Sequence, residues 1–114
     1  MLKIYGIKNC DSVRKALKFL KSHDIPFEFI DFRETPVDEP TIREWLEGAE
    51  LKPLFNTRGA TYRSLKLKEL DLDENEKIEW LAKENILIKR PVIVLDKKVI
   101  IGYNESEYSD QLLS

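Results

Sequence analysis

The first 32 residues constrain the fold of this chain more than any other segment. The segment Leu-Lys-Ile-Tyr at 2–5 has the composition of a short strand, and it stops at Gly6. Apolar residues then recur at the i, i+3, i+4, i+7 spacing of one helical face, at Val13, Ala16, Leu17 and Leu20. The segment 27–32 is rich in aromatic residues that favour strands. Together these segments predict a βαβ unit with two parallel strands and a right-handed crossover.

The middle of the chain, about 33–89, has the pattern of a helical insertion. Asp38 followed by Pro40 indicates one helix start. Asp73 with Glu76 indicates another, because this pair has the spacing of a capping box. The helical patterns continue until the strand-like residues after Pro91.

The last quarter of the chain predicts two strands and a helix. Two apolar runs, 92–95 and 99–101, flank Asp-Lys-Lys at 96–98, which predicts a β-hairpin with a three-residue turn. Asn104 and Glu107 have the spacing of a cap for a final helix. The expected fold is therefore α/β, with the order βαβ, a helical insertion and then ββα.

Composition excludes several classes of function. The 114 residues fit a single domain over 1–114. With 19 basic and 21 acidic residues, the net charge of −2 does not favour direct nucleic-acid binding. Cys10 is the one cysteine, so neither an internal disulfide nor a cysteine-paired zinc site can form, and we expect no bound metal. No apolar run has the length of a signal peptide core or a membrane span, so we expect a cytoplasmic protein.

Basic residues gather in three predicted loops although the net charge is small. The loops are 8–10 together with Arg14, 57–59, and 89–91. If these loops meet in space, Cys10 lies in a local site for anions. The sequence alone does not bring them together.

Cys10 falls between the first strand and the first helix. Unpaired amide groups and the helix dipole favour negative charge at such a position, and the thiolate is the nucleophilic form of cysteine. Arg14 lies one helical turn further on, and Ser12 is a candidate helix cap or hydrogen-bond donor to the thiolate. The alternative is a buried structural thiol, because free cysteine is among the most buried residue types.

Four short segments together make a family resemblance visible. They are Tyr-Gly-Ile-Lys-Asn-Cys-Asp-Ser at 5–12, Asn-Thr-Arg-Gly at 56–59, Arg-Pro-Val at 90–92 and Gly-Tyr at 102–103. The sequence resembles the arsenate reductase-like (ArsC/Spx) family of thioredoxin-like proteins, most closely its small YffB-like subgroup. The resemblance covers nearly the whole chain. It implies a thioredoxin-like (glutaredoxin-like) four-stranded mixed sheet with a helical insertion after the second strand, which agrees with the predicted order.

The resemblance also implies roles for individual residues. It makes Cys10 the nucleophile and Arg14 part of its anion-binding loop. Arg58 and Arg90 match two of the three arginines with which arsenate reductases hold oxyanion and thiolate. Pro91 matches the cis-proline beside the active cysteine of thioredoxin-like folds. Without the resemblance, Arg58 is an ordinary arginine in a turn and Arg90 is the start of a strand.

The sequence departs from the family pattern at two places. The third arginine would lie near the end of the last strand, where this chain has Gly102 and Tyr103, so arsenate reduction is less expected. The Spx regulators usually carry a CxxC redox switch, whereas Val13 stands at the fourth position here. An internal disulfide switch is therefore excluded.

The resulting prediction is a thiol oxidoreductase in which Cys10 attacks a disulfide, a glutathione adduct or a small oxyanion. An external thiol must then release the product, and glutathione, with or without glutaredoxin, is the expected co-substrate and partner. The alternative from another class is an Spx-like regulator that binds RNA polymerase without catalysis. A third hypothesis is an adaptor without chemistry.

Overall fold

A four-stranded mixed sheet forms the centre of the fold in the computed structural model, which describes residues 1–113. The strand order is β2-β1-β3-β4. β1 pairs with β2 in parallel, and the other two pairs of neighbours are antiparallel. The strands are β1 (Leu2–Gly6), β2 (Phe27–Asp31), β3 (Val92–Leu95) and β4 (Lys98–Ile101). This topology confirms the predicted α/β, thioredoxin-like arrangement.

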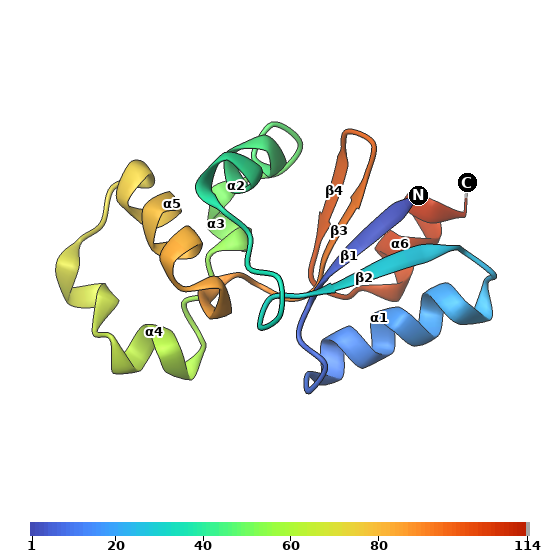
Figure 1. Ribbon diagram of the computed structural model, residues 1–114, viewed down its shortest axis with the longest axis horizontal. Coiled ribbons are helices and arrows are strands. Elements are labelled where there is room, and N and C mark those ends of the chain that lie inside the picture. The colour runs from blue at the N-terminus through green and yellow to red at the C-terminus, as the bar shows by residue number, and fades with distance from the viewer. Residues whose placement is uncertain (114) are drawn as a thin grey trace.

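The helices divide into two groups (Figure 1). α1 (Asp11–Ser22) and α6 (Glu105–Leu112) run beside the strands. The helices between β2 and β3 gather beyond one end of the sheet. They are α2 (Glu39–Trp45), α3 (Leu51–Leu54), α4 (Ala60–Ser64), the 3-10 helix η1 (Leu67–Leu70), α5 (Glu74–Lys83) and the 3-10 helix η2 (Asn85–Leu87).

Three helices begin where the sequence predicts, each with a side-chain cap. Asp73 and Glu76 form a reciprocal capping box at α5, with hydrogen bonds of 2.8 and 3.1 Å. The side chain of Asn104 accepts a hydrogen bond from an amide in the first turn of α6. Asp38 caps α2 through the amide and hydroxyl of Thr41, and these hydrogen bonds lower the pKa of the Asp38 carboxyl.

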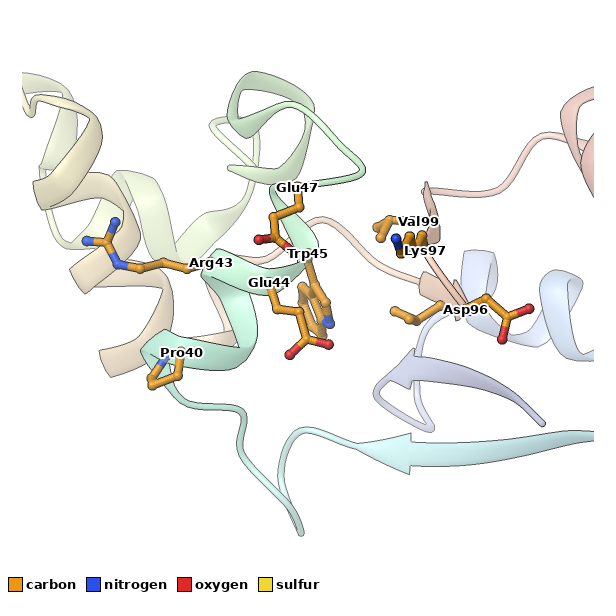
Figure 2. A pocket seen from close by; sticks show the side chains of 9 residues that line it. Pro40, Arg43, Glu44, Trp45, Glu47, Asp96, Lys97 and Val99 are labelled. Atoms are coloured by element: carbon orange, nitrogen blue, oxygen red, sulfur yellow. The ribbon is translucent and has the colours of Figure 1, made fainter.

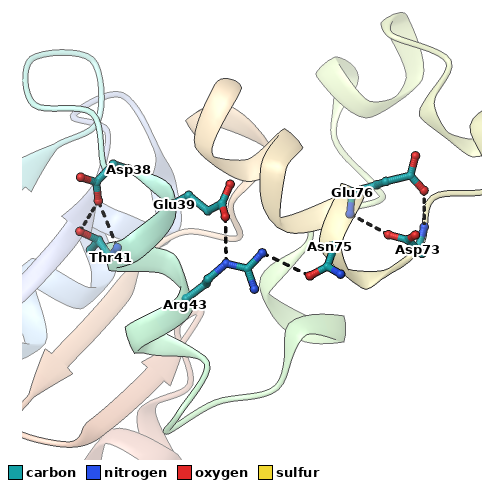
Figure 3. A network of polar contacts seen from close by, with 7 residues as sticks. All are labelled: Asp38, Glu39, Thr41, Arg43, Asp73, Asn75 and Glu76. Carbon is teal, nitrogen blue, oxygen red and sulfur yellow. Dashed lines mark hydrogen bonds and ion pairs between the residues drawn. The ribbon is translucent and has the colours of Figure 1, made fainter.

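One further contact ties two helices of the insertion together. Arg43 of α2 donates to Glu39 on its own helix at 2.9 Å and to Asn75 of α5 at 3.2 Å, as Figure 3 shows. The guanidinium therefore joins the first helix of the insertion to the last long one.

The hairpin between β3 and β4 differs from the sequence prediction in its turn. Leu95 pairs with Lys98, so the turn has two residues rather than three. Asp96 takes a positive φ of 56° there, which aspartate tolerates better than most residues. The prediction was wrong because Lys98 has little strand preference of its own and joins the sheet through its pairing with Leu95.

Two clusters of buried side chains form the core, one on each face of the sheet. Neighbouring strand residues alternate between them, as Ile4 and Tyr5 do, because successive side chains point to opposite faces. The α1–α6 cluster consists of Leu2, Ile4, Ala16, Phe19, Leu20, Ile93, Ile100 and Tyr108. The sheet–insertion cluster consists of Tyr5, Ile7, Phe32, Val37, Ile42, Trp45, Leu54, Phe55, Leu67, Ile78, Leu81, Leu87, Ile88 and Val92. The insertion thus shares its core with the sheet.

Candidate functional site

Cys10 is the N-cap residue of α1. Its backbone is extended, with φ −145° and ψ 125°, and its carbonyl accepts the first helical hydrogen bond from Arg14 at 3.0 Å. Across residues 1–113, the amide groups of Asp11, Ser12 and Val13 have no hydrogen-bond acceptor. These amides are the unpaired donors of a helix N-terminus, so Cys10 lies at the end of α1 that favours negative charge.

The Cys10 side chain is half-buried and packs against the sheet–insertion cluster. In the part of the chain that the structure describes, its sulfur makes no hydrogen bond. Ser12 is the second residue of α1, so the prediction that Ser12 caps this helix is wrong: the helix begins two residues earlier than such a cap requires. Its role as a donor to the thiolate stays a prediction.

Arg14 is paired with an acidic neighbour on its own helix. It forms an ion pair with Asp11 and lies 3.4 Å from the side-chain oxygen of Asn9. Both partners of the ion pair are exposed. The i, i+3 spacing of Asp11 and Arg14 could have predicted this pair. The positive charge of Arg14 is therefore shared with a carboxylate at the start of α1.

The Arg90-Pro91 peptide bond is cis, as the family resemblance implied. The next residue, Val92, pairs with Tyr5 of β1, so Pro91 follows the sheet register toward the end of β1 from which the chain continues to Cys10. Arg90 is half-buried and donates from Nη1 to the carbonyl of Ile86 at 2.7 Å. Its Nε is buried and has no partner among the described residues.

The loop that contains Arg58 is attached to the segment before Pro91 by backbone pairing. Phe55 and Ile88 form an isolated antiparallel bridge. On either side, the amide of Asn56 donates to Leu87 and the amide of Lys89 donates to Leu54, both at 2.8 Å. The structure therefore holds two of the three basic loops side by side.

The third basic loop, which contains Cys10, is not joined to the other two basic loops by polar contacts. Within residues 1–113, no hydrogen bond or ion pair joins the loop around Cys10 to Arg58 or Arg90. Arg58 is exposed, and its amide donates to the side chain of Asn56 at 3.1 Å. Binding of the thiolate by these arginines stays a prediction.

A cavity of about 820 Å³ opens beside the attached loops and is lined by both Arg58 and Lys89. From the sequence, Lys89 was predicted to belong to a basic loop, but no function was predicted for this residue. Nor did the sequence connect Lys52 of α3 or Lys77 of α5 with Arg58, although both line the same cavity. No sequence spacing relates these residues, because they come from four separate segments.

A second hollow, of about 970 Å³, lies between α2 and the β3–β4 hairpin (Figure 2). Its charged residues have mixed signs, with Glu44, Glu47 and Asp96 against Arg43 and Lys97. None of the residues predicted to form the site lines it. This hollow is therefore separate from the candidate site.

Two other classes of site have no support in the described residues. Residues 1–113 contain no group of three or more histidine, cysteine, aspartate or glutamate side chains that could hold a metal ion. The same residues form no helix with the length and apolar character needed to cross a membrane.

Comparison with solved structures finds close matches. A protein described as YffB (PA3664) superimposes with a TM-score of 0.91 at 31% identity, covering 98% of this chain and 99% of that chain. A protein from Streptococcus mutans UA159, described as a possible arsenate reductase, has a TM-score of 0.82 at 38% identity, covering 96% and 98% of the two chains.

A regulator also matches most of the chain. The global transcriptional regulator Spx of Listeria innocua is 31% identical over 109 residues, covering 94% of this chain and 83% of Spx. The ArsC family model matches residues 5–111. Because that match spans almost the whole sequence, the chain belongs to the ArsC family.

Proposed function

We propose that this protein is a glutathione-dependent thiol oxidoreductase with Cys10 as its nucleophile. The observation that carries the proposal is the position of Cys10 at the N-cap of α1, where three amide groups have no acceptor among the described residues. Partial negative charge on the sulfur is favoured there by the amide dipoles. The half-buried side chain leaves part of the thiol open to a substrate.

The reaction that fits one cysteine is a thiol–disulfide exchange with two steps at Cys10. The Cys10 thiolate attacks one sulfur of a disulfide, the S–S bond breaks, and the other sulfur leaves as a thiolate that takes up a proton. The mixed disulfide on Cys10 is then attacked by a glutathione thiolate, which restores Cys10. This second step releases the other half of the substrate as its mixed disulfide with glutathione. A second glutathione thiolate then attacks that mixed disulfide and frees the last substrate thiol. In sum, one disulfide is reduced to two thiols while two glutathione molecules are oxidised to one glutathione disulfide.

The resolving thiol must come from outside, because the chain has one cysteine. Glutathione is abundant in the reducing cytoplasm, where free thiols persist, and glutaredoxin is the protein partner that would accept a glutathione adduct. We therefore place the protein in the cytoplasm with glutathione as co-substrate.

Arg58 and Arg90 are proposed to bind the carboxylate or oxyanion of the substrate, with Arg14 and Ser12 nearer the thiol. Guanidinium groups suit this task because they donate two parallel hydrogen bonds to such anions. Arg90 already has a buried Nε without a hydrogen-bond partner in the part of the chain that the structure describes. A small oxyanion such as arsenate is the less favoured substrate, since the third arginine of arsenate reductases is absent.

The alkylation rate of Cys10 measured against pH tests the thiolate. We expect iodoacetamide to alkylate Cys10 faster than it alkylates a free model thiol at neutral pH. Intact mass after incubation with oxidised glutathione should then show one glutathione added, and reduced glutathione should remove it. A reaction profile like that of a free thiol, together with no adduct, would overturn the proposal. Glutathione-coupled reduction of arsenate, absent in Cys10→Ser, is the separate test of the arsenate version.

A second candidate is favoured by the Spx match: a regulator that binds RNA polymerase without catalysis. Spx of Listeria innocua is similar over 94% of this chain. At the position of the second switch cysteine, Val13 is fully buried, and its side chain fills the space beside Gly6. Because the second switch cysteine is absent, this chain would bind RNA polymerase independently of redox state. Capture of purified RNA polymerase by wild type and Cys10→Ser alike would favour this function over the oxidoreductase.

A further inference from the structure

The cavity beside Arg58 concentrates positive charge from four separate segments. Lys52 lies on α3, Arg58 in the following loop, Lys77 on α5 and Lys89 two residues before the cis-proline. The carboxylates that line the same cavity are Glu50 and Glu74. Four cations against two carboxylates leave a net charge of +2 on the lining.

These four cations remain unpaired although carboxylates are close by. The three ion pairs among residues 1–113 involve Lys8, Arg14 and Arg43, and none involves a cation of the cavity. Most cations outside the cavity also form no ion pair among these residues. What distinguishes the cavity is that four such cations share one lining, where they are available to a ligand.

The walls and size of the cavity suit a small molecule. Its volume of about 820 Å³ lies within the roughly 300–1,000 Å³ range of small-ligand sites. Phe55 and Ile101 supply apolar surface, and the side-chain amide nitrogen of Asn56 has no acceptor within residues 1–113. The segments are held in place by the Phe55–Ile88 bridge and its two flanking hydrogen bonds.

From this arrangement we infer that the cavity is a binding site for a small dianion, meaning a molecule with two anionic groups that are either carboxylates or phosphates. Two such groups supply at least the two negative charges that balance the +2 of the lining. Carboxylates and phosphates share the ability to accept hydrogen bonds from lysine and arginine, so both sources fit the same donors. Arg58 is shared with the substrate-binding arginines proposed above, whereas Lys52, Lys77 and Lys89 have no part in that proposal. Binding at this site does not require Cys10.

The first test is a titration of isotope-labelled wild-type protein followed by amide chemical shifts. The probes are inorganic pyrophosphate and succinate, with acetate at equal ionic strength as the monoanion. We expect saturable shifts for residues 50–58, 74–77, 89 and 101 with the dianions. Preference for pyrophosphate identifies a phosphate ligand, and preference for succinate a dicarboxylate. Shifts confined to other residues, or equal binding of acetate, would overturn the inference.

Variants provide the second test. Lys52→Gln/Lys89→Gln should weaken dianion binding by about tenfold for each cation removed, because charged hydrogen bonds are lost. The matched control Lys3→Gln/Lys15→Gln removes the same charge at exposed positions outside the cavity and should change affinity less than about twofold. Equal weakening in both doubles would mean a non-specific charge effect and would refute the site.

A third variant separates this inference from the proposed function. Cys10→Ser removes the thiol chemistry, yet it should bind pyrophosphate or succinate as the wild type does. If the wild-type shift map is present and Cys10 is unreactive, the cavity assignment stands and the oxidoreductase fails. If Cys10 is reactive and no dianion binds, the oxidoreductase stands and the cavity assignment fails.

Discussion

The start of α1 and the cavity lined by Lys52, Arg58, Lys77 and Lys89 differ in which groups are left without partners. At the start of α1, the exposed cation Arg14 is paired with Asp11, and the groups left open beside Cys10 are backbone amides. In the cavity the backbone is paired through the Phe55–Ile88 bridge, and the groups left open are long cationic side chains. Fixed amide dipoles suit a fixed sulfur atom, whereas flexible lysines suit a ligand that arrives and leaves.

This difference has a consequence for screening by salt. At moderate ionic strength, salt largely screens the attraction between exposed charges that are more than about 8–10 Å apart. The Cys10 side chain is half-buried, and interactions of partly buried charges are screened much less. The two regions should therefore respond differently to substitution, salt and pH, and each prediction below separates them.

The largest effect is expected from Cys10→Ser. Formation of the mixed disulfide with glutathione should be abolished, because serine has no sulfur to form it, and any coupled reductase activity should fall to the rate of the uncatalysed reaction. Intact mass spectrometry and a glutathione-coupled assay measure this. Reductase activity that survives in the variant would show that the thiol site is not where we place it.

Ile88→Ala should destabilise the protein by about 2–5 kcal/mol, since Ile88 is fully buried and a cavity would remain. It should also weaken dianion binding, because Ile88 forms the bridge that holds the loop of Arg58 against Lys89. Urea unfolding and the shift titration measure the two effects. Leu20→Ala, which is equally buried in the α1–α6 cluster, is the control that should cost similar stability and leave the affinity unchanged.

Raising the salt concentration from about 0.05 to 0.5 M should weaken dianion binding by tenfold or more, while the alkylation rate of Cys10 changes by less than about twofold. The shift titration and the iodoacetamide reaction, run in the same buffers, compare the two regions directly. A strong loss of thiol reactivity with salt would show that side-chain cations, and not the helix amides, stabilise the thiolate.

Asp11→Asn should raise the alkylation rate of Cys10 by about two- to fivefold. It removes a negative charge next to the thiol and frees Arg14, and an exposed ion pair of this kind is worth about 0.2–1 kcal/mol. It should also destabilise α1 slightly, since an acid in the first turn favours the helix. Glu79→Gln, at an exposed position on α5, should leave the rate unchanged.

A small effect is expected at Tyr108 in the α1–α6 cluster. Its buried hydroxyl donates to the carbonyl of Gly102 at 2.6 Å, and the side chain of Lys89 lies against Gly102. Tyr108→Phe should cost about 0.5–1.5 kcal/mol of stability at neutral pH and leave Cys10 reactivity unchanged. Urea unfolding of both proteins measures the difference.

Tyr108 also predicts a pH dependence. Burial raises the pKa of Tyr108 above its ordinary value of 10.0. The folded state therefore holds this proton more tightly than the unfolded state, so its contribution to stability is present below pH 10 and is lost as the pH rises above that value. In Tyr108→Phe the alkaline decline should be shallower. Asp38, whose pKa is lowered, gives the opposite sign: its contribution is lost as the pH falls below 3.8.

Local patterns predicted much of the fold. The βαβ start, the helical insertion and the caps at Asp38, Asp73 and Asn104 all follow from residues within a few positions of one another. The position of Cys10 before α1 is of the same kind. The two errors were also local. The hairpin turn is one residue shorter, and the first helix begins at a position where Cys10, not Ser12, is the cap.

Arg14 shows that the position of a basic residue in a sequence motif does not determine which group its side chain contacts. Its place one turn after Cys10 suggested that it faces the thiol, and the structure pairs it with Asp11 instead. Side chains three residues apart on a helix are neighbours, so the pairing could have been predicted from the same segment. The family resemblance implied the cis bond before Pro91, which the local sequence did not.

By itself the sequence determined the order of elements, the single nucleophilic thiol and the absence of a second thiol to resolve it, because these depend on residue identity and short-range spacing. The tertiary structure decided which cations share a surface. Lys52, Arg58, Lys77 and Lys89 line one cavity because the sheet–insertion cluster and the Phe55–Ile88 bridge fold α3, α5 and the segment before β3 against one another. Contacts between such distant segments follow from packing the whole core, which no local pattern encodes.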